Sequence, residues 1–119
     1  MISPEDRDEF VVLQRAYDLV VDLIPRINKF PRSFKFTLGD RCQDAALDAL
    51  LLLVEARWRR DRAVALDAAN SALDRLRYLL RLSGDFQLLP VSAVADVSRR
   101  IDDVGRMVGA WRKKGRAAP

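Results

Sequence analysis

Residues 30–41 read Phe-Pro-Arg-Ser-Phe-Lys-Phe-Thr-Leu-Gly-Asp-Arg and separate the first two helical patterns of the chain. A proline disfavours helical backbone at the residue before it, so we expect the first helix to stop near Phe30. Thr37, with Asp40 three positions later, forms a variant capping box and predicts that the second helix starts at residue 38. The aromatic and basic side chains of this stretch either close and rim one end of a helical bundle or form a binding surface.

Four segments repeat apolar residues at alternating intervals of three and four, the spacing that turns one helical face towards a partner helix. We expect helices over residues 4–29, 38–60, 63–83 and 91–113, and a basic tail over residues 112–119. The first apolar stripe consists of Phe10, Leu13, Tyr17, Val20, Ile24 and Ile27. The second consists of Leu38, Cys42, Ala45, Ala49, Leu52 and Ala56, and its apolar surface is broader than one seam requires. The third consists of Leu66, Ala69, Leu73, Leu76, Leu80 and Ser83, and the fourth of Val94, Val97, Ile101, Val104, Val108 and Trp111. Because short connectors make consecutive helices antiparallel, the predicted fold class is all-α, an up-down-up-down four-helix bundle formed by one domain of residues 1–119.

The ends of these helices carry residues with known terminal preferences. Ser3 is expected to cap the first helix, and Pro25 to kink that helix or end it early. Gly84 is suited to a left-handed conformation at the end of the third helix. Residues 59–63 contain neither Gly nor Pro, so the second and third helices are either separate or parts of one bent helix.

The composition is that of an ordinary globular protein. Of the 119 residues, 50% are apolar and 32% are charged, which differs from the composition of disordered chains. The single cysteine, Cys42, lies at an apolar helical position and predicts a buried, inert thiol. The N-terminal segment is acidic rather than basic, and no apolar run is long enough to span a bilayer. We therefore expect a cytoplasmic protein without a membrane partner.

The groups that most often perform catalysis are missing from the sequence. The chain contains no histidine, no phosphate-binding glycine loop and no Cys-x-x-Cys pair. Asp40, Asp44 and Asp48 share one helical face and are compatible with a magnesium-dependent nuclease, but the Glu-x-x-His motifs of carboxylate-bridged bundle sites are absent. We favour the alternative of a solvated acidic face, and expect a protein that is not an enzyme and uses no metal or cofactor.

Basic residues are unevenly distributed along the chain, although the formal net charge is only +4. Residues 1–24 carry two basic and six acidic side chains, whereas residues 106–119 carry five basic and none acidic. In the predicted bundle, the 57–62 connector shares one end with residues 111–114, and residues 30–41 lie at the other end. Cations neutralise phosphates, and aromatic rings stack on unpaired bases. The candidate residues for binding nucleic acid or a partner protein are Arg26, Lys29, Arg32, Lys35, Arg57, Trp58, Arg59, Arg60, Arg77, Arg81, Arg112, Lys113 and Lys114.

Two tryptophans and two glycines each allow a packing role or a contact role. Trp111 lies on the fourth apolar stripe and is expected in the core, whereas Trp58 lies off the second stripe and is the more open candidate. Gly105 and Gly109 are four residues apart in the last helix, a spacing that lets another backbone come close. We expect close helix packing at these glycines, either within the chain or as an oligomer contact.

Several motifs follow one another in a characteristic order along residues 10–113. They are the segments at 17–24, 30–32, 36–41, 76–82 and 104–111. Their order and spacing resemble the Avd proteins, the accessory variability determinants of diversity-generating retroelements. Those proteins are related to the four-helix bundle proteins encoded in ribosomal RNA intervening sequences.

This resemblance implies a homopentameric barrel of four-helix bundles with a basic surface. It further implies that the protein binds the element's reverse transcriptase and its template RNA, or a DNA/RNA hybrid, and supports adenine-directed mutagenic reverse transcription. The alternative is a structural oligomerisation module of the intervening-sequence type that does not bind RNA directly. The matched motifs look mainly architectural, so the candidate contact residues come from the charge pattern alone.

Overall fold

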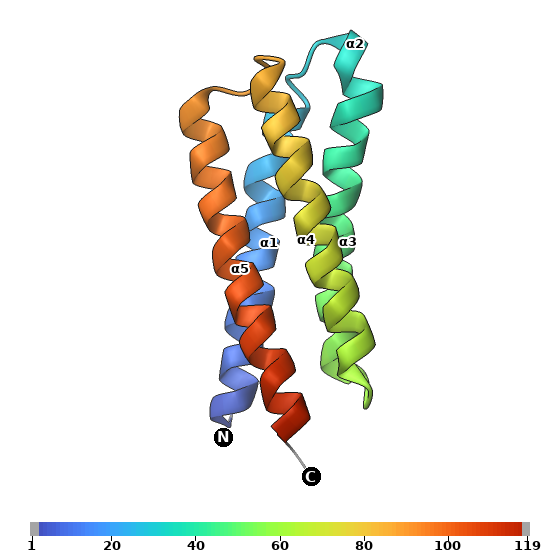
Figure 1. Ribbon diagram of the computed structural model, residues 1–119, viewed down its shortest axis with the longest axis vertical. Coiled ribbons are helices and arrows are strands. Elements are labelled where there is room, and N and C mark those ends of the chain that lie inside the picture. The colour runs from blue at the N-terminus through green and yellow to red at the C-terminus, as the bar shows by residue number, and fades with distance from the viewer. Residues whose placement is uncertain (1–2, 118–119) are drawn as a thin grey trace.

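The computed structural model describes residues 3–117, and this part of the chain forms four long helices and no strand (Figure 1). The long helices are α1 (Pro4–Ile27), α3 (Asp40–Trp58), α4 (Arg62–Asp85) and α5 (Val91–Ala117). Between α1 and α3 lie the short helix α2 (Arg32–Phe34) and the π-helical turn η1 (Lys35–Gly39). The turn η1 continues directly into α3.

The four long helices are antiparallel to their neighbours and form a closed ring. Helix α3 packs against α1 and α4, and α5 packs against α4 and α1. The start of α1, the end of α5 and the α3–α4 connector lie at one end of the elongated bundle, which we call the terminal end (Figure 1). Helix α2, η1 and the α4–α5 loop lie at the other end, the π-helix end. The predicted all-α, up-down-up-down four-helix bundle is therefore confirmed.

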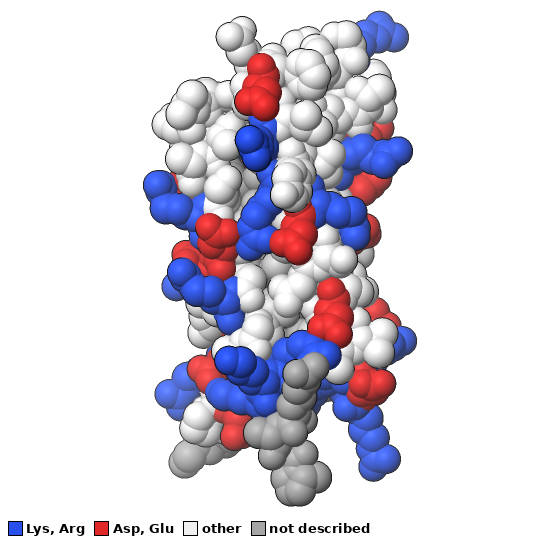
Figure 2. Space-filling model, in the orientation of Figure 1, with Lys and Arg blue, Asp and Glu red and all other residues white. Residues whose placement is uncertain are grey.

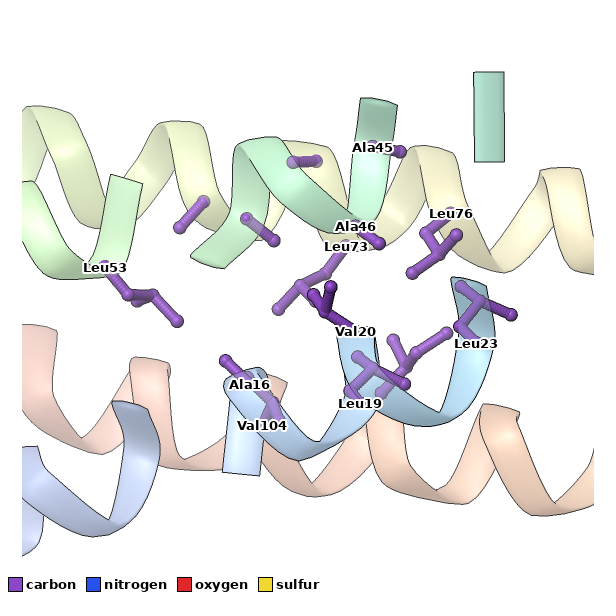
Figure 3. Packing of buried hydrophobic residues seen from close by; sticks show 14 of the residues in the cluster. Ala16, Leu19, Val20, Leu23, Ala45, Ala46, Leu53, Leu73, Leu76 and Val104 are labelled. Carbon is purple, nitrogen blue, oxygen red and sulfur yellow. The ribbon is translucent and has the colours of Figure 1, made fainter. Parts of the chain in front are cut away.

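The core is a continuous column of aliphatic side chains along the bundle axis. Figure 3 shows Leu19 and Leu23 of α1 pointing towards Leu73 and Leu76 of α4. Where α3 and α4 face each other, many of the buried residues are alanines, which lets the two backbones approach closely. These alanines are Ala45, Ala46, Ala49 and Ala56 of α3 and Ala65, Ala69 and Ala72 of α4.

The first apolar stripe was predicted correctly at Val20 and Ile27, which are buried, but wrongly at its two aromatic residues. The buried row contains Val12, Ala16 and Leu19, whereas the predicted core residues Phe10 and Tyr17 are 51% and 55% exposed. Helix α1 is apolar over more than half of its circumference, so two overlapping rows fit the same spacing. The smaller side chains fill the interior, and the larger aromatic side chains remain at the surface.

The start of α1 agrees with prediction, but the start of the second helical segment does not. The Ser3 hydroxyl accepts a 3.1 Å hydrogen bond from the Asp6 amide and caps α1. The predicted cap Thr37 lies inside the helical segment, where its hydroxyl donates to the Phe34 carbonyl. Helical backbone begins after Pro31, whose carbonyl accepts from the amides of Phe34 and Lys35. Because proline needs no hydrogen-bond partner for its nitrogen, it suits a helix start without a side-chain cap.

The end of α4 also differs from prediction. Gly84 lies within the helix, and the residue with positive φ is Gln87, at 61°. The amide of Gln87 donates to the Gly84 carbonyl, and the amide of Leu88 donates to the Ser83 carbonyl over 2.8 Å. This pair of bonds is a Schellman motif with glutamine in the left-handed position. Gly84 instead permits close packing, since a Cβ there would lie 3.0 Å from Val94 Cγ2.

The remaining boundaries concern α1 and the connector between α3 and α4. Helix α1 contains Pro25 and ends two residues later at Ile27, so it stops within one turn of the proline. Three non-helical residues, 59–61, separate α3 from α4. The second and third helices predicted from the sequence are therefore separate, and the alternative of one bent helix is wrong.

Candidate nucleic-acid and partner interface

The terminal end brings together the two basic clusters that contain tryptophan. A hollow of about 1150 Å³ opens between α1, the α3–α4 connector and the last turns of α5. Its lining includes Arg57, Arg60 and Arg62 from the connector region and Trp111 and Lys114 from α5. The predicted proximity of the 57–62 segment and the end of α5 is therefore confirmed.

Many cations at the terminal end are held by carboxylates. Arg62 Nη1 lies 2.8 Å from Oε1 of the buried Glu9, and Lys114 Nζ lies 2.8 Å from Asp8 Oδ2. This contact with Asp8 raises the pKa of the Lys114 ammonium. Arg59 pairs with Glu55 at 2.7 Å, and the guanidinium of Arg112 donates to both carboxylate oxygens of Asp67. Arg57 and Arg60 have no ion pair within the described residues.

The two tryptophans at this end have different environments. Trp111 is 6% exposed, and its indole N–H has no hydrogen-bond partner in the part of the chain that the structure describes. Trp58 is 77% exposed, and the Arg57 guanidinium lies 5.1 Å from its ring centroid and 4.8 Å from that of Phe10. Trp111 is therefore a core residue, as expected, and Trp58 is available for contact.

The π-helix end combines exposed aromatic rings with unpaired cations. Phe36 and Phe86 are 64% and 54% exposed, and the rings of Phe34 and Phe86 meet with centroids 5.3 Å apart. These three rings line a shallow hollow of about 660 Å³. Within residues 3–114, no carboxylate lies within ion-pair distance of the cations at this end, namely Lys29, Arg32, Lys35 and Arg41. Arg26, one turn before this end, pairs with Asp22 at 3.2 Å.

The α4–α5 face carries both signs of charge. Figure 2 shows basic and acidic side chains interspersed over these helices. Arg77 bridges Asp74 of its own helix and Asp102 of α5, and Arg75 lies 3.7 Å from Asp48 of α3. The candidates Arg77 and Arg81 thus differ, because Arg81 is exposed and makes no ion pair with the described residues. Lys113, near the end of α5, is likewise exposed and unpaired among them.

The two candidate oligomer glycines have different surroundings. A Cβ at Gly105 would lie 3.2 Å from Nη2 of Arg77, and a Cβ at Gly109 would meet nothing within 4 Å. Gly105 therefore makes room for the Arg77 side chain of α4, a packing contact within the chain, whereas Gly109 makes no such contact with the described residues. A contact with another subunit stays a prediction.

One surface was only partly anticipated from the sequence, through the broad apolar pattern of the second helix and the open candidate Trp58, and we call it the α1–α3 face. It consists of Phe10, Tyr17 and Val21 on α1 and Leu51, Val54 and Trp58 on α3, all at least 40% exposed. The spacings of seven and four on α1, and of three and four on α3, place each set on one side of its helix. Arg57 contacts the rings of both Phe10 and Trp58 and so links the two rows. The signal was present in the sequence as the excess width of the apolar pattern in these helices.

Two further features bear on the kind of site. No group of three or more potential metal ligands occurs among the described residues. None of the helices in this part of the chain combines the length and the apolar character needed to cross a membrane.

The fold and the site define a class of small four-helix bundle protein whose exposed functional groups are cations and aromatic rings at the helix ends. The bAvd-like family model matches residues 10–115, and the chain belongs to this family. No curated protein matches the chain. The family match confirms the resemblance found in the motifs and points to an accessory protein of the Avd type.

Proposed function

We propose that the protein is the non-catalytic accessory factor of a diversity-generating retroelement and acts in the cytoplasm. In this role it binds the element's reverse transcriptase and its template RNA, or a DNA/RNA hybrid, and supports mutagenic reverse transcription. Membership of the bAvd-like family supports the accessory role.

The observation that carries RNA binding is the set of cations left without carboxylate partners. A cation that is already neutralised by a neighbouring carboxylate gains little from a phosphate, whereas an unpaired one releases condensed counterions when it binds. Among the candidates, those without an ion pair to a described residue are Lys29, Arg32, Lys35, Arg57, Arg60, Arg81 and Lys113. They lie mainly at the two ends of the bundle.

Self-association as a homopentamer is part of the proposal. Contiguous exposed apolar surface is uncommon on monomeric proteins and marks interaction sites. The α1–α3 face supplies such a surface, and the open space beside Gly109 on α5 allows a second helix backbone to approach. A ring of subunits would repeat the unpaired cations around its axis and strengthen the field met by a polyanion.

Salt-titrated binding of the template RNA, with and without the reverse transcriptase, tests this function. We expect the affinity to fall steeply and linearly on logarithmic axes as salt rises, because phosphate contacts release counterions. The charge reversal Arg60→Glu should weaken binding and flatten the salt dependence. An affinity that hardly changes between low and high salt contradicts the proposal.

The second candidate function is a structural oligomerisation module without direct RNA binding. The ion pairs of Arg59, Arg112 and Lys114 favour it, because these cations already have partners on the protein. Light scattering and a retroelement activity assay on the double charge reversal of Arg59 and Arg60, which lie outside the α1–α3 face, separate the two candidates. A structural module keeps both assembly and activity, whereas an RNA-binding factor keeps assembly and loses activity.

A further inference from the structure

We propose that the π-helix end binds an unpaired stretch of RNA, with bases stacked on Phe36 and Phe86 and phosphates held by neighbouring cations. This inference rests on the proposed function, because it takes RNA as the ligand. It adds the form of the RNA and the residues that contact its bases.

The rings of Phe36 and Phe86 are exposed, but the backbone that carries them is held in place by hydrogen bonds and packing. Phe86 is the C-cap residue of α4, and the Schellman bonds of Gln87 and Leu88 fix the backbone that follows it. On the other side, η1 is pressed against the end of α1, because a Cβ at the buried Gly39 would lie 3.2 Å from Ile27 Cγ2. Rings on an ordered backbone lose little conformational freedom when a ligand binds, which favours affinity.

The rings form one surface although they come from distant segments. Phe34 joins them, since its ring lies 5.3 Å from that of Phe86 with a 38° angle between the planes. Phe36 lines the same shallow hollow. Every base has a flat π face, so phenyl rings bind bases with little sequence preference.

The charges at this end indicate on which side the RNA backbone lies. Lys29 and Arg32 are exposed and, with the half-buried Lys35, have no carboxylate partner among the described residues. On its α3 side the hollow is lined by Arg41 together with Asp40 and Asp44, so the two carboxylates outweigh the one cation there and this side repels phosphates. We therefore place the RNA backbone along the side of this end formed by α1 and α2, and the RNA bases over the rings of Phe36 and Phe86.

The exposed rings favour unpaired RNA over a duplex. In a duplex, each base already stacks on its neighbours, and only splayed bases can meet an aromatic side chain. Trp58 is the other exposed aromatic candidate, but it belongs to the α1–α3 face and its ring already has the Arg57 guanidinium nearby. The unpaired cations around Phe36 make a polyanion a better match than an apolar protein segment.

Fluorescence anisotropy of the full chain with a labelled uridine oligonucleotide, and with an RNA duplex of equal length, tests the inference. We expect Phe36→Ala to weaken binding of the oligonucleotide about 5- to 150-fold and to change duplex binding little. The salt dependence should stay as in the wild type, because no charge is removed. Phe36→Tyr should retain binding, and Phe36→Leu should not. Tyr78→Ala, which removes an exposed ring on α4 away from this hollow, is the matched control and should bind as the wild type does. A thermal melt checks folding of each variant.

The outcomes separate this inference from the proposed function. If the wild-type chain binds neither RNA, both the inference and the proposed RNA binding fail. If the wild type binds and Phe36→Ala or Phe36→Leu binds equally well, stacking is overturned while RNA binding stands. If Phe36→Ala keeps RNA binding but loses the reverse transcriptase, this end is a protein-docking surface, and the inference is also overturned.

Discussion

The carboxylate of Glu9 is buried in α1 and lies 2.8 Å from the guanidinium of Arg62, the first residue of α4. The Arg62 guanidinium also lies 6.0 Å from the centroid of the Trp111 ring. One arginine thus joins α1, α4 and α5 at the terminal end. It also fixes the position of the connector that carries Arg59 and Arg60.

Removing Arg62 should destabilise the bundle more than removing a surface cation does. Arg62→Ala leaves the Glu9 carboxylate buried without its partner, which should lower the free energy of unfolding by about 1–3 kcal/mol. Glu9→Gln, which removes the charge itself, should cost less. Arg59→Ala breaks an exposed pair and is the matched control, with an expected loss of about 1 kcal/mol or less. Urea unfolding measures all three, and equal losses for Arg62→Ala and Arg59→Ala would contradict the role given to the buried pair.

The Schellman motif at the end of α4 offers a stabilising substitution. Gln87 has a φ of 61°, a conformation that strains a residue with a Cβ but not glycine. Gln87→Gly should therefore raise the free energy of unfolding by about 0.5–1 kcal/mol, as measured by urea unfolding. Gly84→Ala, three residues earlier, should destabilise because its Cβ would press on Val94. If Gly84→Ala stabilises and Gln87→Gly does not, the assignment of the two positions is wrong.

The sequence predicts the interior of the bundle well where only one apolar row exists. Leu66, Leu73 and Leu76 of α4, and Val97 and Ile101 of α5, are buried as their stripes predicted. On α1 the same reasoning was right for Val20 and Ile27 and wrong for Phe10 and Tyr17, because the apolar residues of this helix form two rows. Periodicity shows that a helix has an apolar face, but it does not show whether that face packs into the interior of the bundle or lies at its surface.

The sequence predicts where the candidate site lies, but it does not predict which of the cations there form ion pairs with carboxylates. Short antiparallel connections alone place the 57–62 segment beside the end of α5. Which cations are neutralised depends on contacts such as Arg62 with Glu9 and Lys114 with Asp8, between residues far apart in the sequence. These contacts depend on side-chain geometry across the helix ends, which spacing along the chain does not determine.

The buried thiol of Cys42 should react slowly with thiol reagents in the native protein. It should also lower the free energy of unfolding at alkaline pH. Burial raises the pKa of this thiol above its ordinary value of 9.0, although a contact with the Ser83 hydroxyl opposes the shift. As pH rises above about 9, the thiol of the unfolded chain loses its proton, whereas the buried thiol of the native state keeps it. Deprotonation therefore favours the unfolded state, and the free energy of unfolding, unaffected by this thiol below pH 9, falls as pH rises. We expect slow reaction with a thiol reagent unless urea is added. The alkaline loss of stability should be smaller in Cys42→Ala, and rapid labelling of the native protein would contradict burial.

The α1–α3 face should control the oligomeric state. A charge placed in the middle of an apolar interface is desolvated without a partner on assembly, so Tyr17→Glu and Leu51→Glu should shift the protein towards monomers. Both side chains are exposed in the single chain, so the variants should keep the helical content and the melting behaviour of a folded bundle. Val64→Glu, which adds the same charge at an exposed position on α4, is the matched control and should assemble like the wild type. Light scattering over a range of protein concentrations measures the mass of each. If Tyr17→Glu and Leu51→Glu assemble normally while Gly109→Leu dissociates, the subunits meet through α5, and the exposed rings of α1 serve another partner.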